Sequence, residues 1–125
     1  MAATSIGLLI ELCGLSQKEA SVYLDVSHDT VRSWSSGRNT TPDRAIISMR
    51  ELYQEIVALA DKTQAQIDAV PKHIDTIRIR MPKSDADAKK RYRMPFISAF
   101  LKSVALICAS STRKIILTQD IAAAE

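Results

Sequence analysis

The segment from Pro42 to Val70 contains no glycine and no second proline, and this uninterrupted length constrains the fold more than any other feature. It opens on Thr-Pro-Asp, a strong helix start, because proline fits the first helical position and an acidic residue suits the start of the helix dipole. Apolar residues then recur at steps of three, four and seven: Ile46, Met49, Tyr53, Ile56, Ala60, Ile67 and Val70. The pattern predicts one helix of up to 29 residues, which at full length would be roughly 43 Å long.

Such a helix is longer than a small N-terminal bundle could cover. We expect plain core packing along its first half, and a partner helix beyond about Leu59, where nothing local is left to bury the apolar side chains. With 46% hydrophobic and 25% charged residues, the 125-residue chain has the composition of an ordinary globular protein. We predict two regions, residues 1–60 and residues 61–125.

Three shorter helices are predicted before the long one. The first lies within residues 4–14. The second begins at Ser16, since Ser16 and Glu19 form a capping box in which each side chain satisfies a backbone donor. Asp25 ends the second helix. Ser27 is the N-cap of the third, which is predicted over residues 27–36.

The second and third helices divide their side chains between two faces. Two short helices joined by a tight turn cross steeply, which allows the start of the second to enter a DNA major groove. Trp34, the only tryptophan, falls on the face of Val31 and is therefore predicted to anchor the core rather than to stack on a base. The inward set is Ala20, Leu24, Val26, Val31 and Trp34; the outward set is Gln17, His28, Asp29, Arg32, Ser33 and Ser36.

The stretch GLSQKEASVYLDVSHDTVRSW and the glycine that follows it resemble the helix-turn-helix of the lambda-repressor-like family, also called Cro/CI or XRE. The resemblance covers residues 6 to about 60 and implies DNA binding as a dimer. The family's turn usually carries glycine where this chain has Asp25, which tolerates the left-handed conformation better than most residues do. The matching positions are Gln17, Ser21, Val26 with Ser27, Val31, Trp34, and Gly37 with Arg38.

The same resemblance implies roles for individual residues. It places His28, Asp29, Arg32 and Ser33 at base edges, and Gln17, Ser36, Arg38, Asn39 and Thr40 at phosphates. Arg32 can donate two hydrogen bonds to guanine, a contact worth roughly 1 to 3 kcal/mol of discrimination. Asp29 could accept from cytosine N4 or support the helix start and orient Arg32. His28 could donate to a base or a phosphate, or be solvated.

The second half predicts a small α+β region, so the fold expected for the whole chain is mainly α. Alternating residues predict strands within 75–82 and 113–120, and the polar, basic residues 84–93 form a short helix or a loop. Residues 95–111, apolar on nearly all sides, predict a helix that is covered all round. In order and length, these elements resemble anti-CRISPR-associated regulators with a C-terminal dimerisation unit. The predicted dimer interface is Phe96, Phe100, Leu101, Val104 and Ile107.

The net charge of +3 conceals an asymmetry between the halves. Residues 1–70 contain six Lys/Arg against nine Asp/Glu, whereas residues 71–125 contain eleven against five. A polyanion would therefore be attracted to the second half. The basic residues of 89–93, and Arg78 with Arg80, are either a solvated surface or extra phosphate contacts.

Several classes of protein are disfavoured. There is no glycine-rich phosphate loop, and the Ser-His-Asp of residues 27–29 cannot form a relay, because adjacent residues on a helix diverge; we predict no enzyme, no cofactor and no metal site. Cys13 and Cys108, each within an apolar run, are predicted to be buried, reduced thiols. We find no secretory signal, and we interpret the apolar block 94–110 as a buried helix, so we expect a cytoplasmic protein without membrane contact.

These observations together predict a sequence-specific transcriptional regulator. Its partner would be double-stranded DNA carrying a palindromic operator, bound by a homodimer that most simply acts as an autorepressor. Two alternatives remain open at this stage. The second half could neutralise a partner protein, as in antitoxins that regulate their own synthesis, or its basic residues could bind RNA.

Overall fold

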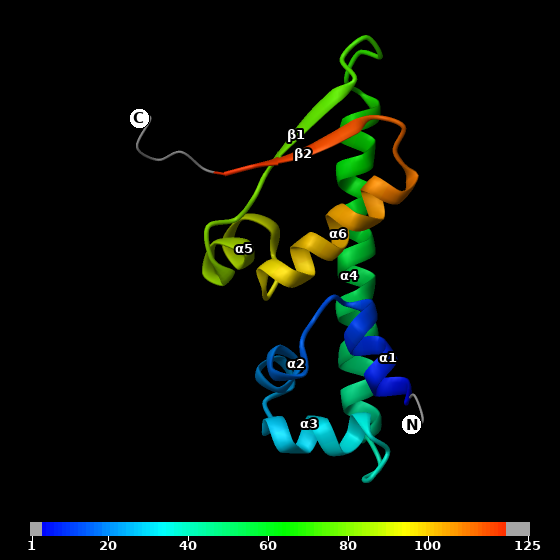
Figure 1. Cartoon of the computed structure of the whole chain (residues 1–125), viewed down its shortest axis with the longest axis vertical. Helices are drawn as coiled ribbons and strands as arrows, with labels where there is room; N and C mark the ends of the chain where they lie inside the picture. Colours follow the sequence, from blue (N-terminus) through cyan, green and yellow to red (C-terminus); the bar gives the residue numbers. More distant parts are fainter. Residues whose placement is uncertain (1–3, 120–125) are drawn as a thin grey trace. The chain divides into compact units, whose positions relative to one another are not determined.

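The computed structural model describes residues 4–119 and is mainly helical, with one small sheet in that range (Figure 1), as the predicted fold class requires. The chain divides into two compact units, Met1–Ile56 and Val57–Glu125, so the boundary falls within a helix. The outer ends of the two predicted regions, 1–3 and 120–125, lie outside the described residues. The elements are α1 (Ser5–Leu12), α2 (Gln17–Leu24), α3 (His28–Ser35), α4 (Asp43–Asp68), β1 (Thr76–Arg80), α5 (Asp85–Tyr92), α6 (Ile97–Ser110) and β2 (Lys114–Thr118).

The helices of the first unit begin where the capping signals predict. Ser16 Oγ accepts from Glu19 N, and Glu19 Oε1 accepts from Ser16 N, both at 3.0 Å, which completes the capping box at the start of α2. Ser27 Oγ accepts from Thr30 N at 3.1 Å at the start of α3. Each bond satisfies a backbone donor that the first helical turn leaves without a partner.

The turn between α2 and α3 depends on a left-handed residue. Asp25 ends α2 with φ 57° and ψ 49°, the conformation expected of it from the sequence. Val26 N then donates to Ser21 O at 3.0 Å, so the chain folds back over the end of α2. Three residues are enough to redirect the chain into α3, and α2 and α3 contact each other.

The core of the first unit is built from one face of each of its helices. Trp34 is 6% exposed and Val31 is fully buried, which confirms the predicted inward face of α3. Cys13 is buried, and its thiol donates to Met49 O at 3.5 Å. The buried apolar residues are Ile6, Ile10, Cys13, Leu15, Ala20, Leu24, Val31, Trp34, Ala45, Met49, Leu52 and Ile56.

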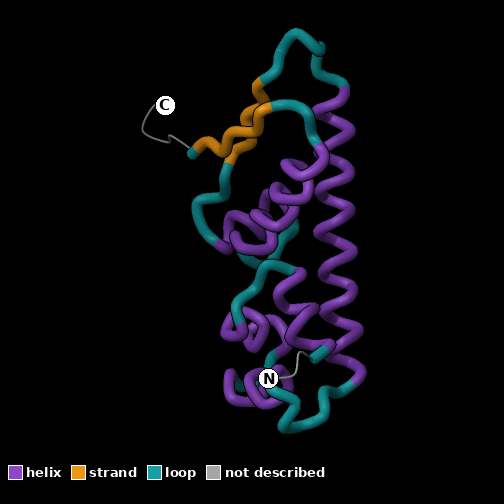
Figure 2. Tube along the Cα trace, turned by 45° about the vertical axis from the view of Figure 1, so that its right-hand side comes forward, coloured by secondary structure: helices purple, strands orange, loops and turns teal. Residues whose placement is uncertain are grey.

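In the second unit, the later part of α4 is covered by the same chain. Ala60 and Ile67 of α4 form a buried cluster with Ile107 of α6, and the sheet contributes half-buried isoleucines from both strands. Figure 2 shows α6 alongside this part of α4 and the two strands side by side. The partner helix expected beyond Leu59 is therefore α6, which the sequence places some 40 residues further along.

The sheet is parallel, with Ile77 opposite Ile115 and Ile79 opposite Leu117. Parallel strands need a crossover connection, and α5 and α6 supply it. The Arg113 guanidinium donates to Val70 O at 2.6 Å and to Ile74 O at 3.3 Å. This side chain thereby ties the start of β2 to the segment that follows α4.

The basic segment 84–93 contains a helix, α5, and the residues at its start cap both α5 and α6. Ser84 Oγ caps it by accepting from Asp87 N at 3.1 Å. Asp85 Oδ1 accepts from Ile97 N at 2.8 Å and so caps α6, whose own N-cap residue makes no side-chain bond. The Tyr92 ring lies 4.3 Å from that of Phe100, which fixes α5 against α6.

The prediction that residues 95–111 are covered all round is wrong. α6 buries one face, and Ala105, Cys108 and Ala109 are exposed. Cys108 is therefore not the buried thiol that its apolar neighbours suggested, because small residues gave no indication of which side would face solvent. Among residues 4–119, no single helix is long and apolar enough to cross a bilayer, although α5 and α6 reach that length and apolarity together across a 55° bend.

Candidate nucleic-acid interface

The exposed side of α3 presents a compact polar surface. His28, Arg32 and Ser36 follow one another at intervals of four residues, which places them in a row along the helix, and Asp29 lies beside that row. All four side chains are exposed. The opposite side of the helix is buried through Trp34, so the core fixes the orientation of the polar row.

Arg32 and Asp29 form an ion pair within this surface. Arg32 Nη1 lies 3.3 Å from Asp29 Oδ1, and the two side chains are 62% and 87% exposed. An exposed pair of this kind contributes roughly 0 to 1 kcal/mol. A ligand that offers Arg32 two acceptors could therefore displace Asp29 at little cost, while in its absence Asp29 restricts where the guanidinium points.

Ser33 is not part of this surface, and the prediction that it faces outward, on which its base contact depends, is wrong. It is 4% exposed, and its Oγ donates to Thr30 O at 2.9 Å. The loop after α3 covers it: Asn39 N donates to Ser33 O, and Asn39 Nδ2 donates to Ser33 Oγ, both at 3.2 Å. Helical spacing alone puts Ser33 near the edge of the exposed side, and only the path of the loop decides that it is buried.

The predicted phosphate-contact residues lie at the start of α2 and in the loop after α3. Gln17, Arg38, Asn39 and Thr40 are all exposed. The Ser36 hydroxyl is already engaged, since it donates to Ser33 O at 3.1 Å and accepts from Arg38 N at 3.4 Å. A phosphate would have to replace the first of these bonds to receive the Ser36 proton.

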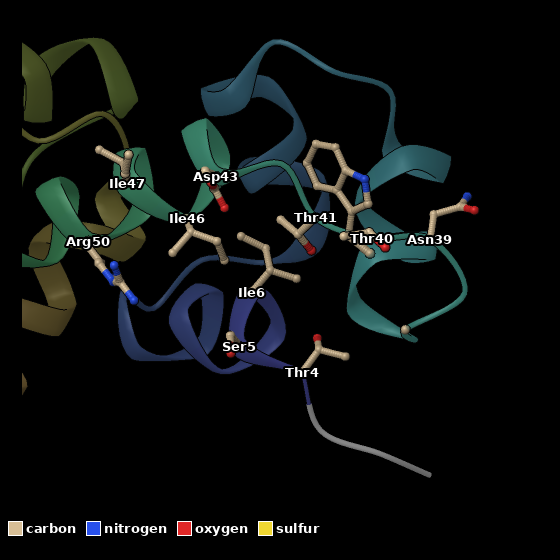
Figure 3. A pocket seen from close by; sticks show the side chains of 12 residues that line it. Thr4, Ser5, Ile6, Asn39, Thr40, Thr41, Asp43, Ile46, Ile47 and Arg50 are labelled. Atoms are coloured by element: carbon tan, nitrogen blue, oxygen red, sulfur yellow. The ribbon is translucent and has the colours of Figure 1, made fainter.

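This loop also borders a hollow in the first unit that sequence reasoning missed. The hollow, of about 660 Å³, has Asn39 and Thr40 on its lining together with Thr4 and Ser5 from the start of α1 and Arg50 from α4 (Figure 3). The Asn39 amide and the Arg50 guanidinium could donate to an anionic ligand, but Thr4 Oγ1 already donates to Ser35 O at 3.0 Å and the carboxylate of Asp43 also lines the hollow. In the sequence, Thr4 could have been noticed only as a residue suited to cap a helix. Thr4 does cap α1, since its Oγ1 accepts from Gly7 N at 3.2 Å.

A second polar cleft, of about 620 Å³, lies within the second unit. Lys62 of α4 lines it together with Lys90 and Arg91 from the end of α5 and with Arg93, which follows that helix. Arg91 Nε lies 2.8 Å from Asp87 Oδ1, so part of its charge is offset. The structure thus brings Lys62 to the basic cluster predicted at residues 89–93.

Two titratable groups beside this cleft are perturbed. The backbone N–H of Lys83, which donates to Asp87 Oδ2 at 2.8 Å, and the neighbouring Arg91 lower the pKa of Asp87, so its carboxylate is ionised at neutral pH. Burial raises the pKa of Tyr92, whose hydroxyl donates to Arg80 O at 2.6 Å. The cleft therefore keeps a neutral phenol beside a group of cations.

The predicted dimer interface on α6 needs correction. Phe100 and Ile107 are each 2% exposed and Val104 is 5% exposed, so the chain's own core already uses these three side chains. Phe96 and Leu101 are half-buried. A helix that packs on α4 and on the sheet has little apolar surface left for a second copy.

No protein-family model matches the chain, and no curated protein matches it significantly. The assignment of a function therefore depends on the geometry described above.

Proposed function

We propose that this chain is a sequence-specific DNA-binding regulator in which α2 and α3 form a helix-turn-helix and α3 enters the major groove. One observation supports this more than any other: the exposed side of α3 carries His28, Asp29, Arg32 and Ser36, while Trp34 holds the other side in the core. A helix held from behind can present its polar row to base edges without rearrangement. The resemblance to lambda-repressor-like proteins is in keeping with this.

Within this proposal, Arg32 reads a guanine through its O6 and N7 atoms, and His28 and Asp29 lie at neighbouring base edges. Gln17, Arg38, Asn39 and Thr40 contact the phosphates on either side, where they fix the register of α3 without reading the sequence. The first unit itself contains five Lys/Arg against seven Asp/Glu. We therefore infer that tight binding requires a dimer on a two-fold repeat, with autorepression as the simplest outcome.

Selection of binding sites from random DNA duplexes tests the proposal. The wild-type chain should enrich an inverted repeat, and Arg32→Ala should lose its preference at one base pair in each half-site, by about 1 to 3 kcal/mol. Arg44→Ala is the matched control, since it removes the same charge from an exposed position in the first part of α4. Equal weakening at every position by both variants would refute the role given to Arg32.

The cleft with Lys62, Lys90, Arg91 and Arg93 favours a second candidate, in which the second unit binds RNA or additional DNA phosphates. Neutralising Lys90 and Arg93 to glutamine should then flatten the dependence of binding on salt, because fewer counterions are released. The pair Lys72→Gln with Lys114→Gln makes the same change of charge elsewhere in this unit. Competition between labelled operator and transcript separates the two ligands, and an unchanged salt slope would indicate a merely solvated surface.

A further inference from the structure

The sheet of the second unit has two outer edges that differ in chemistry. At its two ends, Lys114 N donates to Asp75 O and Met81 N donates to Thr118 O, each at 2.8 Å. Since the backbone groups of a strand point alternately to either side, odd-numbered residues of β1 and even-numbered residues of β2 face each other. The groups that point outward belong to Thr76, Arg78 and Arg80 on β1 and to Ile115 and Leu117 on β2.

The β1 edge is protected against the addition of another strand. The Tyr92 hydroxyl donates to Arg80 O at 2.6 Å and so occupies one of the outward carbonyls. Arg78 and Arg80 are exposed, and a second copy that paired antiparallel on this edge would bring arginines close together. Like charges across strands are destabilising, and charged residues are a common means of protecting an edge.

Within the described residues, the β2 edge is less protected, because the one charged residue of the strand, Lys114, lies at its start. Its centre, Ile115–Leu117, is uncharged, and Leu117 is 38% exposed. Among residues 4–119, no group bonds the outward backbone N–H or carbonyl of Ile115 or Leu117. The register puts Leu117 on the same sheet face as Ile115, the face that packs on α4 and α6, so its exposed side chain extends that apolar face outward.

We propose that β2 is the strand through which two copies of this chain associate, paired antiparallel about a two-fold axis at Ile116. In this register Ile115 exchanges backbone hydrogen bonds with Leu117 of the second copy, and their side chains pack together on the apolar face. Lys114 lies opposite Thr118 of the second copy, so no like charges meet. The strand is thus complementary to itself, as a two-fold interface requires.

This surface replaces the one predicted on α6, and it does not depend on DNA binding. Strand addition satisfies the outward backbone groups of Ile115 and Leu117, which have no partner among residues 4–119, and encloses the Leu117 side chain. An edge of five residues is a small interface, so we expect a dissociation constant on the order of 10 µM. If the proposed function holds, the same contact joins the two copies on an inverted repeat.

Disulfide trapping tests the register in the full chain. Ile116 would form a non-hydrogen-bonded pair with its counterpart, with Cα atoms about 4.5 Å apart, a separation that a disulfide accepts. Ile116→Cys in a Cys108→Ser background should therefore give a covalent dimer on mild oxidation at about 50 µM, several times the expected dissociation constant. Arg78→Cys, directly opposite on β1 and on the same sheet face, is the matched control and should stay monomeric. Failure of the first variant to cross-link, or equal cross-linking of both, would overturn the proposal.

Sedimentation velocity without DNA supplies an independent test. Ile116→Lys and Ile116→Asp should each be monomeric where the wild type dimerises, and an equimolar mixture should restore association, because opposite charges then meet at the axis. A monomeric wild type at about 100 µM, or charged variants that associate normally, would overturn the proposal. Since no DNA is present, these results are separate from the outcome of site selection.

Discussion

Replacing Trp34 by alanine should remove most of the stability of the first unit. The indole is 6% exposed and lies on the same side of α3 as the fully buried Val31. Truncating a buried tryptophan to alanine usually destabilises a protein by about 3 to 5 kcal/mol. A unit of some 56 residues has roughly 3 to 8 kcal/mol of unfolding free energy in total, so at the middle of both ranges Trp34→Ala should retain only about 1 to 2 kcal/mol.

The measurement is urea unfolding followed by far-ultraviolet circular dichroism, because the variants lack the tryptophan that fluorescence would use. Trp34→Phe keeps an aromatic ring in the same site and should fold, with a loss of about 1.5 kcal/mol. Arg32→Ala is the control on the same helix. The Arg32 side chain is 62% exposed, and within residues 4–119 it pairs with the exposed Asp29, so the free energy of unfolding of Arg32→Ala should fall by no more than about 1 kcal/mol.

The opposite pattern would refute the reasoning. Suppose the free energy of unfolding of Trp34→Ala lay within about 0.5 kcal/mol of the wild-type value and yet the variant lost DNA affinity. The indole would then be a ligand contact and not the support behind α3. The orientation assigned to His28 and Arg32 depends on that support. Their proposed roles would then fail together with it.

Three further predictions concern the ends of helices. Asp25→Gly should raise the free energy of unfolding by about 0.5 kcal/mol, because the relief of strain at the positive φ of 57° outweighs the entropy that glycine adds to the unfolded chain. Asp25→Ala should lower the free energy of unfolding, and thermal melts should therefore show the two variants shifting in opposite directions. Asp85→Ala should lower the free energy of unfolding by about 1 kcal/mol, because α6 loses the carboxylate that accepts from Ile97 N. In the same melts, Asp85→Asn should retain most of the wild-type free energy of unfolding. The Lys83 N–H and Arg91 hold the pKa of Asp87 below its usual 3.8, so the ionised carboxylate stabilises the fold above about that pH and this stabilisation is lost on acidification. Denaturant titrations should find the difference in unfolding free energy between wild type and Asp87→Asn largest near neutral pH. A difference that grew in acid would contradict the direction of this pKa shift.

Much of the local structure could be predicted because its causes are local. Interactions within about four residues determine where the helices begin and end. They include the caps at Ser16 and Ser27, the left-handed Asp25 and the uninterrupted run after Pro42. Their positions in the sequence therefore suffice to locate the helix ends. The same holds for the buried side of α3, because helical spacing alone places Val31 and Trp34 together.

Other features depended on contacts between distant segments. Ser33 is buried because Asn39 of the following loop folds back onto it, and Cys108 is exposed because α6 turns its other side to α4. The prediction of a dimer interface on α6 failed for the same reason: an apolar pattern shows that a helix must be covered, but not by which segment.

The edges of the sheet illustrate this difference most clearly. Alternation in the sequence was sufficient to find both strands, because side chains point to opposite faces with a period of two. Their parallel pairing, and with it the question of which backbone groups remain outward, required the crossover through α5 and α6 to bring the strands together. Hydrogen bonding between strands joins residues about 38 positions apart, and no local preference of either strand specifies its partner.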